Sequence, residues 1–592
     1  MAEYQNPQQQ EPGSERRLLL VFLLTFVILI VFQPLLKKYL PQAPPAPQKE
    51  KQSATEQSAP APAVAAPALA AKLPVSISSK QASVESETVI ENSLYKVTFT
   101  NRGAQVKSWI LKKFDNDAQN GPLDLVNASA SQKYGYPLSL WTYDEALRNK
   151  LNSALFVASN QGTLTAPAQI SFEYADQDVV ARKTFHFDHT YLLNVETSVI
   201  YKGAEVFAAP AWPGGFGDEL TTASFASARI DYHNDASNER TALIFPSFIS
   251  RLAVKNISGG NTIRGPFEWA GPGDQYFTAI FIPDDPNTAA MVTLRNPLQV
   301  PRDPSKPDKE TVNIDLIGAA VGNLRGATTE RIYVGPKELS SLEAVHVPDI
   351  RNGDADLRGT VDFGWWGLIA RPLFLWLKWT YKHVYPNWGW AIVIQTLIIT
   401  ILLLPLRITQ MKSMLKMQRI APQIKSIQEK YKKYSLRDPR KAQMNEEVAA
   451  LYKKEGVNPA GGCLPLLIQF PFLIAYYRML GVALDLRHAH WLWIHDLSAP
   501  DHILAIGMIL SMFLMQRITP QAAGMDPAQQ KMMNWMMPLM MGVIFYNLQA
   551  GLNLYYAESN LISIAQQAIM NRTKLGRDMR EMMEKRARKK EK

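Results

Sequence analysis

The stretch GGCLPLLIQFPFLIAYYRML, residues 461–480, has the length and hydrophobicity of a helix that crosses a membrane. It also carries features that such a helix usually avoids. Pro465 and Pro471 interrupt its hydrogen-bond ladder, Gln469 lies between them, and Arg478 comes before the apolar run ends. Polar groups that face lipid are costly, whereas prolines are tolerated where water or neighbouring helices satisfy the freed carbonyls. We therefore expect this segment to border a polar interior.

Apolar segments of similar length occur elsewhere in the chain. The first, residues 18–36, follows two arginines and precedes two lysines rather than a small-residue cleavage site. This pattern favours an uncleaved N-terminal anchor, with a cleaved signal peptide as the alternative. The other predicted spans cover residues 388–406, 463–484, 502–516, 532–548 and 552–569. The sequence thus predicts a multi-domain membrane protein with six transmembrane helices, of which the last five form an all-α polytopic core.

Composition divides the rest of the 592 residues. The Pro- and Ala-rich residues 41–74 predict an extended linker. Residues 75–350 contain short alternating runs between turn residues, which predicts a large antiparallel β-sandwich. An aromatic and basic stretch within 351–387 is typical of a helix that lies in the membrane interface. The predicted domains are residues 1–40 (N-terminus and anchor), 41–74 (linker), 75–350 (β-domain), 351–387 (linker and interfacial helix), 388–570 (five-helix core) and 571–592 (basic tail).

Charge predicts the orientation of these parts. Residues 407–461 carry 13 Lys or Arg against five Asp or Glu, and residues 571–592 carry ten against four. The connection over 485–501 carries one arginine and three aspartates. Because basic loops stay in the cytoplasm, both termini and the 407–461 segment should be cytoplasmic, and the β-domain should lie outside.

The basic segment 407–461 should fold as a helical hairpin. Ile420, Ile424 and Ile427 recur at steps of four and three, so one helix presents an apolar seam, and Val448 continues the pattern on a second helix. A solvated hairpin without a partner is one interpretation, and a landing site for anionic lipid headgroups or ribosomal RNA is the other. The candidate contact residues are Lys425, Lys430, Lys432, Lys433, Arg437 and Arg440, together with Lys585, Arg586, Arg588, Lys589 and Lys590 in the tail.

Polar residues inside the spans point to a groove. Thr400 and Gln469 each lie six residues from the inner end of their spans, which places both about 9 Å deep, and Gln395 and Thr396 lie deeper. A wet cavity open to the cytoplasm is the favoured interpretation of the set, whereas hydrogen bonding between helices would explain any one of these residues. Ten of the 21 methionines fall within 508–541, a composition that suits a surface accepting many apolar shapes.

Two charged residues lie at matched depth near the outer ends of their spans. Arg478 and Glu558 each sit about six or seven residues from that end. Matched depth predicts an ion pair that closes the groove on the outside. The alternative is that Glu558 faces the groove as a functional acid.

Catalytic signatures are missing from the sequence. It contains no GxSxG elbow, no HExxH and no phosphate-binding GxxxxGK[ST] loop. Its single cysteine, Cys463, rules out an intramolecular disulfide and a four-cysteine metal site. HAHWLWIH at 488–495 reads as an interfacial loop rather than a metal site. We expect no enzymatic activity, no cofactor and no metal.

Several motifs resemble the YidC membrane protein insertase family, of the Gram-negative type with a large periplasmic domain. They are NPAGGCLPLLIQFPFLIAYYRML, LWIHDLSAPD, NWGWAIVI and GLNLYYAESNLISIAQQ, in the family's order. The resemblance implies insertion and folding of inner-membrane proteins, alone or with the Sec translocon, in a hydrophilic groove open to the cytoplasm and to lipid. The implied partners are nascent inner-membrane proteins, the ribosome, signal recognition components and anionic lipids, but not DNA.

The resemblance also implies site residues. Thr396 and Tyr556 match substrate-facing positions, and Gln469 falls on the groove-lining helix. The family's groove carries a positive charge at the position that ungapped alignment gives to Thr400. Since the nearest basic residue, Arg407, is expected at the headgroups, the sequence predicts a neutral groove.

Two other functions stay open on the residues alone. A small-solute transporter would explain polar residues within spans, although the five core spans lack the internal repeats that would favour it. A membrane-anchored periplasmic binding module would explain the β-domain but would leave the membrane half without a task.

Overall fold

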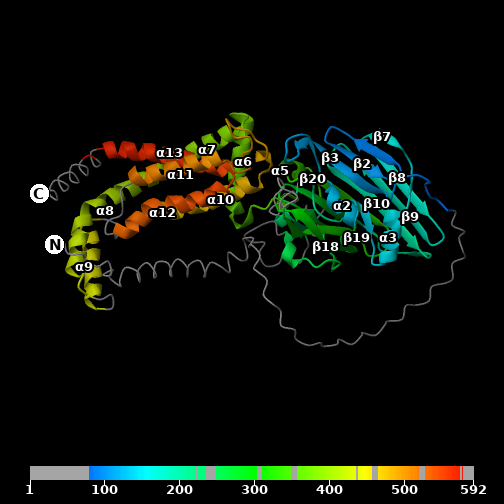
Figure 1. Ribbon diagram of the computed structural model, residues 1–592, viewed down its shortest axis with the longest axis horizontal. Coiled ribbons are helices and arrows are strands. Elements are labelled where there is room, and N and C mark those ends of the chain that lie inside the picture. Colours follow the sequence, from blue (N-terminus) through cyan, green and yellow to red (C-terminus); the bar gives the residue numbers. More distant parts are fainter. Residues whose placement is uncertain are drawn as a thin grey trace. The chain divides into compact units, whose positions relative to one another are not determined.

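The computed structural model describes residues 79–217, 219, 225–233, 249–302, 310–347, 357–434, 438–456, 464–518, 527–573 and 577. The side chains of residues 365, 414, 415, 418, 464–470 and 527–533 are not part of this description. The predicted anchor and linker over 1–74 lie outside the described residues. The chain divides into a β-rich unit and a helical unit between Asp362 and Phe363, rather than at the predicted Ile350 (Figure 1).

The described residues of the β unit form three sheets, and Figure 1 shows their strands. The first has the order β4 (Pro122–Asp124), β3 (Gln105–Asp115), β2 (Tyr95–Thr100), β1 (Glu87–Glu91) and β7 (Gly162–Thr165). The second, ten-stranded sheet runs β14 (Ser250–Ala253), β13 (Arg229–His233), β16 (Trp269–Gly273), β17 (Phe277–Pro283), β20 (Thr328–Pro336), β10 (Leu192–Tyr201), β9 (Val179–Phe187), β8 (Ala168–Ala175) and β6 (Val157–Ala158), with β11 (Ala204–Glu205) paired to β10. The third runs β15 (Thr262–Arg264), β18 (Ala289–Pro301), β19 (Thr311–Asn323), β12 (Ala209–Trp212) and β5 (Ser139–Trp141). Short helices α2 (Ala128–Tyr134), α3 (Glu145–Ser153) and α5 (Leu339–Glu343) complete the unit.

The described strands pair in the antiparallel sense that the sequence predicts, with one exception. Neighbouring strands are antiparallel, as in the register Ile280↔Tyr333 between β17 and β20, but β1 and β7 are parallel. Alternation explains why the strands pack face to face, since β2 reads YKVTFT and buries every second side chain. Phe99 of β2 meets Phe185 of β9 at 4.8 Å between ring centroids. The core of the unit therefore includes an aromatic layer between the first and second sheets.

A buried lysine crosses this layer. Lys183 of β9 is completely buried, and its ammonium donates to the carbonyl oxygens of Gly103 (3.2 Å), Ala104 (2.5 Å) and Leu138 (2.5 Å). No ion pair of this lysine occurs in the described parts of the chain. Burial lowers the pKa of Lys183 to about 7.

We expect Lys183 to make the stability of the β unit depend on pH. Between pH 7 and 9 the unfolded chain keeps a proton on this lysine that the folded chain has partly released. The lysine's contribution therefore rises with pH in this window, by about 2 kcal/mol in the free energy of unfolding, and is lost as pH falls toward 7. Lys183→Met should reduce the measured rise by this amount and leave the part that other groups, such as buried Lys337, contribute. Denaturant unfolding at pH 7 and 9, followed by near-ultraviolet circular dichroism, measures it; the exposed Lys96→Met on β2 serves as control and should keep the rise. An equal rise in Lys183→Met would contradict the assignment.

The helical unit contains the elements of the predicted core. They are α6 (Gly367–His383), α7 (Trp388–Leu402), α8 (Leu404–Lys430), α9 (Arg440–Lys454), α10 (Leu464–Val482), α11 (His502–Ile518), α12 (Pro527–Tyr546) and α13 (Ala550–Arg572). Asn387 starts α7, because its side chain accepts a hydrogen bond from the Trp390 amide. In the bundle, α13 packs against both α7 and α11, and α11 packs against α12. In Figure 1, α8 leads out of the bundle to α9.

Two glycines lie where neighbouring elements of the bundle approach one another. Gly551 on α13 leaves room for Ile392 of α7 and Leu480 of α10, whose side chains lie within van der Waals reach of a Cβ at that position. Gly389 on α7 lies against the Trp491 side chain of the 485–501 connection. Small residues at such points let helices and loops approach closely.

The described helices were compared with the length and hydropathy that a membrane span needs. None of the described helices qualifies singly as a span. α6 and α7 qualify only as a pair, and a bend of 120° separates them. α11 is apolar, but it is too short to qualify as a span on its own.

Candidate functional site

Polar side chains from α7 occupy the interior of the bundle. Gln395 and Thr396 are fully buried and Thr400 is 5% exposed. The Gln395 amide donates to the Leu373 carbonyl of α6 at 2.9 Å and accepts from the Tyr476 hydroxyl of α10 at 2.7 Å. One amide thus connects three helices, as an apolar environment requires of a buried polar group.

The hydroxyl groups of the two threonines donate to backbone carbonyls of their own helix. Thr396 donates to the Ile392 carbonyl and Thr400 to the Thr396 carbonyl, both at 2.7 Å. This i−4 bonding leaves the hydroxyl oxygens as acceptors toward the bundle interior. The carboxyl of Glu558 on α13 lies beside the Thr396 hydroxyl.

Aromatic residues of α13 lie at one end of this polar region. Tyr555 stacks on Tyr476 with 4.3 Å between ring centroids and an angle of 19°. Tyr556, a predicted substrate-facing residue, meets Phe545 of α12 edge to face at 4.7 Å. The structure therefore places Tyr556 at the α12–α13 contact, next to Tyr555.

Among the residues that the structure describes, no ion pair joins Arg478 and Glu558. The Arg478 guanidinium lies near Gly364, ahead of α6, whereas Glu558 points toward α7. Depth along a helix fixes the level of a side chain but not the direction in which it points, so matched depth alone did not bring these two together. Glu558 instead lies beside the polar residues of α7.

A cation enters the interior from α8. Arg407, expected at the headgroups, donates to the Ser563 hydroxyl of α13. α8 begins two residues after α7 ends, and Arg407 lies seven positions, about two turns, beyond Thr400. Its long side chain lets the guanidinium lie away from its own backbone. No carboxylate pairs with Arg407 among the residues that the structure describes. Arg407 therefore supplies a cation that the expectation of a neutral groove did not include.

Together these groups form what we call the polar column, made of Gln395, Thr396, Thr400, Arg407, Tyr476, Tyr555, Glu558, Ser559 and Ser563. From Tyr555 to Ser563 it extends about 12 Å along α13. Several polar atoms near it are buried without a partner in the described structure, including Asn553 Oδ1, Glu558 Oε2 and Gln566 Oε1. Such atoms are costly unless a polar ligand or water reaches them.

Sequence reasoning missed part of this column. Tyr476, Tyr555, Ser559 and Ser563 carry no sequence signal that separates them from ordinary apolar or small positions of a span. Arg407 could have been considered because it directly follows the end of the predicted span and has a long side chain.

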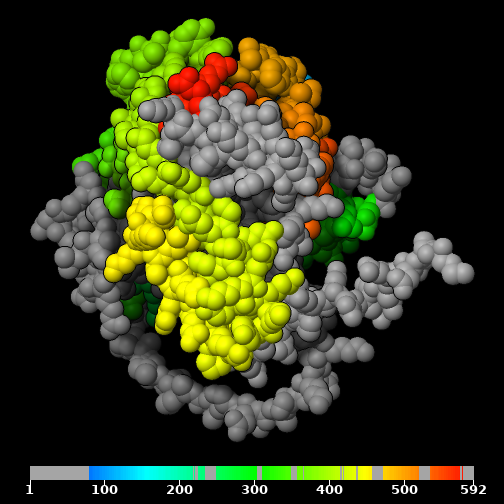
Figure 2. Space-filling model, turned by 90° about the vertical axis from the view of Figure 1, so that its left-hand side faces the viewer, coloured from blue at the N-terminus to red at the C-terminus, as the bar shows by residue number. Residues whose placement is uncertain are grey.

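The hairpin of α8 and α9 forms a separate candidate surface, coloured yellow in Figure 2. Ile420 and Ile424 are buried between the helices and pack with Val448 and Leu451. Of its predicted contact residues, Lys425, Lys430, Lys432, Lys433 and Arg440 are exposed. Lys430 pairs with Glu447 across the hairpin at 2.8 Å and Arg440 with Asp438 at 3.0 Å.

Other predicted site residues cannot be placed. Arg437 and the tail residues Lys585, Arg586, Arg588, Lys589 and Lys590 lie outside the described residues. Gln469 lies on α10, but its side chain is not described. Within the described ranges, no group of three or more His, Cys, Asp or Glu could hold a metal ion.

Two family models match the chain. A model described as 60Kd inner membrane protein matches residues 379–577, and one described as YidC periplasmic domain matches residues 87–376. Together they cover both structural units.

Curated relatives match nearly end to end. The membrane protein insertase YidC of Syntrophus aciditrophicus is 30% identical over 601 residues, covering 94% of this chain and 99% of the relative. That of Maridesulfovibrio salexigens is 31% identical over 593 residues, with coverage of 94% and 99%. A crystal structure of an active YidC insertase with its first transmembrane domain resolved aligns at 16% identity and a TM-score of 0.34, covering 83% of this chain and 95% of the other.

Proposed function

This chain belongs to the YidC family of membrane protein insertases, and we propose that it inserts and helps fold inner-membrane proteins by way of the polar column. It acts alone or beside the Sec translocon on nascent inner-membrane proteins. Family membership favours this function over a small-solute transporter or a periplasmic binding module. The observation that carries the mechanism is Arg407, a cation inside the helical bundle with a serine as its hydrogen-bond partner.

The proposed setting is the inner membrane, to which the matching family model refers. Charge supports the topology: the basic hairpin and tail stay in the cytoplasm, and the β unit lies in the periplasm. The inner ends of α7 and α10 then face the cytoplasm, as does the end of the polar column that holds Arg407. Tyr476 and Tyr555 lie toward the periplasmic end.

The polar column lowers the cost of moving polar segments through the bilayer. A charged side chain costs about 3 kcal/mol at the centre of a membrane helix on translocon-based scales. Hydroxyl oxygens of Thr396 and Thr400 and the orphaned carboxyl oxygen of Glu558 offer partners that lipid lacks. A polar stretch of a nascent chain in this region is therefore partly solvated while its apolar helix moves into lipid.

Arg407 gives the column a preference for acidic segments. An unpaired guanidinium in a medium of reduced dielectric attracts a carboxylate by several kcal/mol at close range. The Tyr476–Tyr555 stack and the Gln395 amide close the column on the periplasmic side, because they fill its cross-section with paired groups. An arriving segment thus meets its partners from the cytoplasmic side only.

The hairpin binds the partners that deliver the nascent chain to the membrane. Its exposed lysines and arginines suit the ribosome, signal recognition components and anionic lipid, all of which present phosphate or acidic surfaces. Surface ion pairs such as Lys430–Glu447 are weak and exchange readily for a stronger anionic partner.

The hairpin should depend on its buried seam. Ile424→Val removes a methylene from the contact between α8 and α9 and should lower the hairpin's local unfolding free energy by about 1 kcal/mol. Hydrogen exchange of α9 amides measures this change. Ile427→Val, at a half-buried position on the same helix, is the control and should cost less. Equal effects of the two changes would show that the seam does not hold the hairpin together.

Reconstitution tests the function itself. Proteoliposomes with the purified chain should convert ribosome-bound nascent chains of a short inner-membrane protein into protease-protected fragments, without Sec components. Liposomes without the protein set the background. Protection at the background level with folded protein would reject the proposal.

A further inference from the structure

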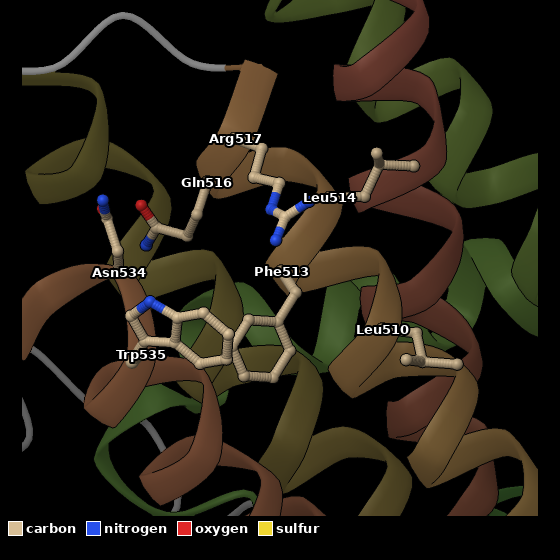
Figure 3. A pocket seen from close by; sticks show the side chains of 7 residues that line it. All are labelled: Leu510, Phe513, Leu514, Gln516, Arg517, Asn534 and Trp535. Carbon is tan, nitrogen blue, oxygen red and sulfur yellow. The ribbon is translucent and has the colours of Figure 1, made fainter. Parts of the chain in front are cut away.

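A pocket of about 360 Å³ lies between α11 and α12, away from the polar column. Figure 3 shows its lining, which consists of Leu510, Phe513, Leu514, Gln516 and Arg517 from α11 and Asn534 and Trp535 from α12. On α11, Ser511 faces α13 and accepts a hydrogen bond from Asn560 at 3.0 Å. The pocket therefore opens on a different face of α11 from the one that meets α13.

Most of the pocket is apolar and faces outward. Leu510 is 63% exposed and Trp535 is 59% exposed, so these side chains meet whatever surrounds the bundle. The rings of Phe513 and Trp535 lie 5.7 Å apart at 60° and form its floor. In an inner-membrane protein, outward apolar side chains at helix level meet acyl chains.

One end of the pocket is polar. Gln516 and Arg517 stand near the end of α11, and Asn534 faces them from α12 (Figure 3). No ion pair of Arg517 occurs in the part of the chain that the structure describes. Asn534 Oδ1 is buried and has no hydrogen-bond partner there. This end offers a cation and an amide N–H for a phosphate and a carbonyl oxygen for a hydroxyl.

We propose that this pocket binds an anionic glycerophospholipid, with the phosphate on Arg517 and Gln516. A headgroup hydroxyl, as in phosphatidylglycerol, donates to Asn534 Oδ1, and an acyl chain lies along Phe513, Trp535 and Leu510. The span from Arg517 back to Leu510 is about 10 Å, which suits the upper part of an acyl chain. In the proposed topology Arg517 lies at the cytoplasmic leaflet, where an arginine favours anionic lipid.

A lipid fits these features better than a nascent polypeptide. The polar groups gather at one end only, and the rest of the surface is continuous apolar wall. An extended polypeptide segment would leave backbone groups unpaired against such a wall, whereas an acyl chain has none.

Native mass spectrometry of the full chain tests the site. The protein is extracted from bilayers of phosphatidylcholine with a fifth of phosphatidylglycerol, and retained phosphatidylglycerol is counted. Arg517→Gln should lower its retention about fivefold, the effect expected of one arginine near the surface. Leu514→Trp, which fills the pocket from an exposed position, should lower it as well. Arg572→Gln, at the end of α13, is the matched control and should retain the lipid as the unaltered chain does.

Other outcomes overturn the proposal. Equal retention by Arg517→Gln and Arg572→Gln would mean that the lipid is held by general charge alone. Displacement by soluble glycerol phosphate would mean that the pocket takes a free phosphate and needs no acyl chain. A photo-crosslinker at Leu514 that captures nascent chains instead of lipid would assign the pocket to the substrate. Because lipid retention is read without any insertion assay, failure here leaves the proposed insertase function untouched.

Discussion

Replacing Arg407 by methionine is expected to reduce insertion of a substrate with an acidic translocated segment by at least about tenfold. A tenfold loss needs only about 1.4 kcal/mol, a fraction of what a guanidinium offers a carboxylate in a partly buried site. Methionine keeps much of the side chain's length and apolar contact, and Ser563 keeps its hydrogen bond to the Ser559 carbonyl, so the bundle should still fold. Protease protection of the nascent chain in proteoliposomes measures the loss.

Two comparisons separate the charge from the fold. Lys382→Met removes a cation from an exposed position on α6, outside the hairpin and the polar column, and should leave insertion unchanged. A substrate whose acidic residues are replaced by neutral ones should lose little in Arg407→Met, because the missing attraction is electrostatic. If both substrates lose insertion equally, Arg407 has a structural role and the electrostatic account of the column fails.

Gly389→Ala should cost the helical unit about 3 kcal/mol in unfolding free energy. A Cβ at this position would lie 2.1 Å from Cγ of Trp491, the root of a rigid ring that cannot rotate away. Trp491 is itself packed, because its ring meets Trp390 at 5.6 Å and most of its surface is buried. Overpacking of this kind typically costs 1–3 kcal/mol, and here the α7–loop contact would have to separate.

A second glycine provides the matched control for this change. Gly507 on α11 has open space where a Cβ would stand, so Gly507→Ala should stabilise the helix by up to about 1 kcal/mol. Unfolding of the purified full chain in mixed micelles measures both. A Gly389→Ala variant as stable as Gly507→Ala would show that Trp491 does not pack tightly against the start of α7.

The sequence could predict the features that depend on periodicity and charge. The seam of Ile420 and Ile424 follows from steps of three and four residues, and the buried face of α7 follows from Gln395, Thr396 and Thr400 lying in one span. These patterns are local, so no knowledge of neighbouring helices is needed.

The contacts between helices could not be predicted, because they depend on how each helix is rotated about its axis. The Tyr476–Tyr555 stack requires α10 and α13 to present particular faces, and a mostly apolar sequence does not specify them. Arg478 and Glu558 show the same limit, since equal depth left their directions open. Arg407 was assigned to the surface because it follows the end of a span, although an arginine side chain is long enough to enter the bundle.

The central claim is that nascent chains pass along the polar column. A photo-crosslinking residue in place of Tyr556 tests it most directly, because Tyr556 adjoins Tyr555 of the column and an aromatic probe fits this aromatic position. The same probe at Ile398, an outward residue of α7 that is 38% exposed, reports contact with lipid and with chance neighbours. With ribosome-bound nascent chains of an inner-membrane protein, we expect clearly stronger adducts at Tyr556 than at Ile398. Adducts of equal strength at the two positions, or at Ile398 alone, would contradict the claim.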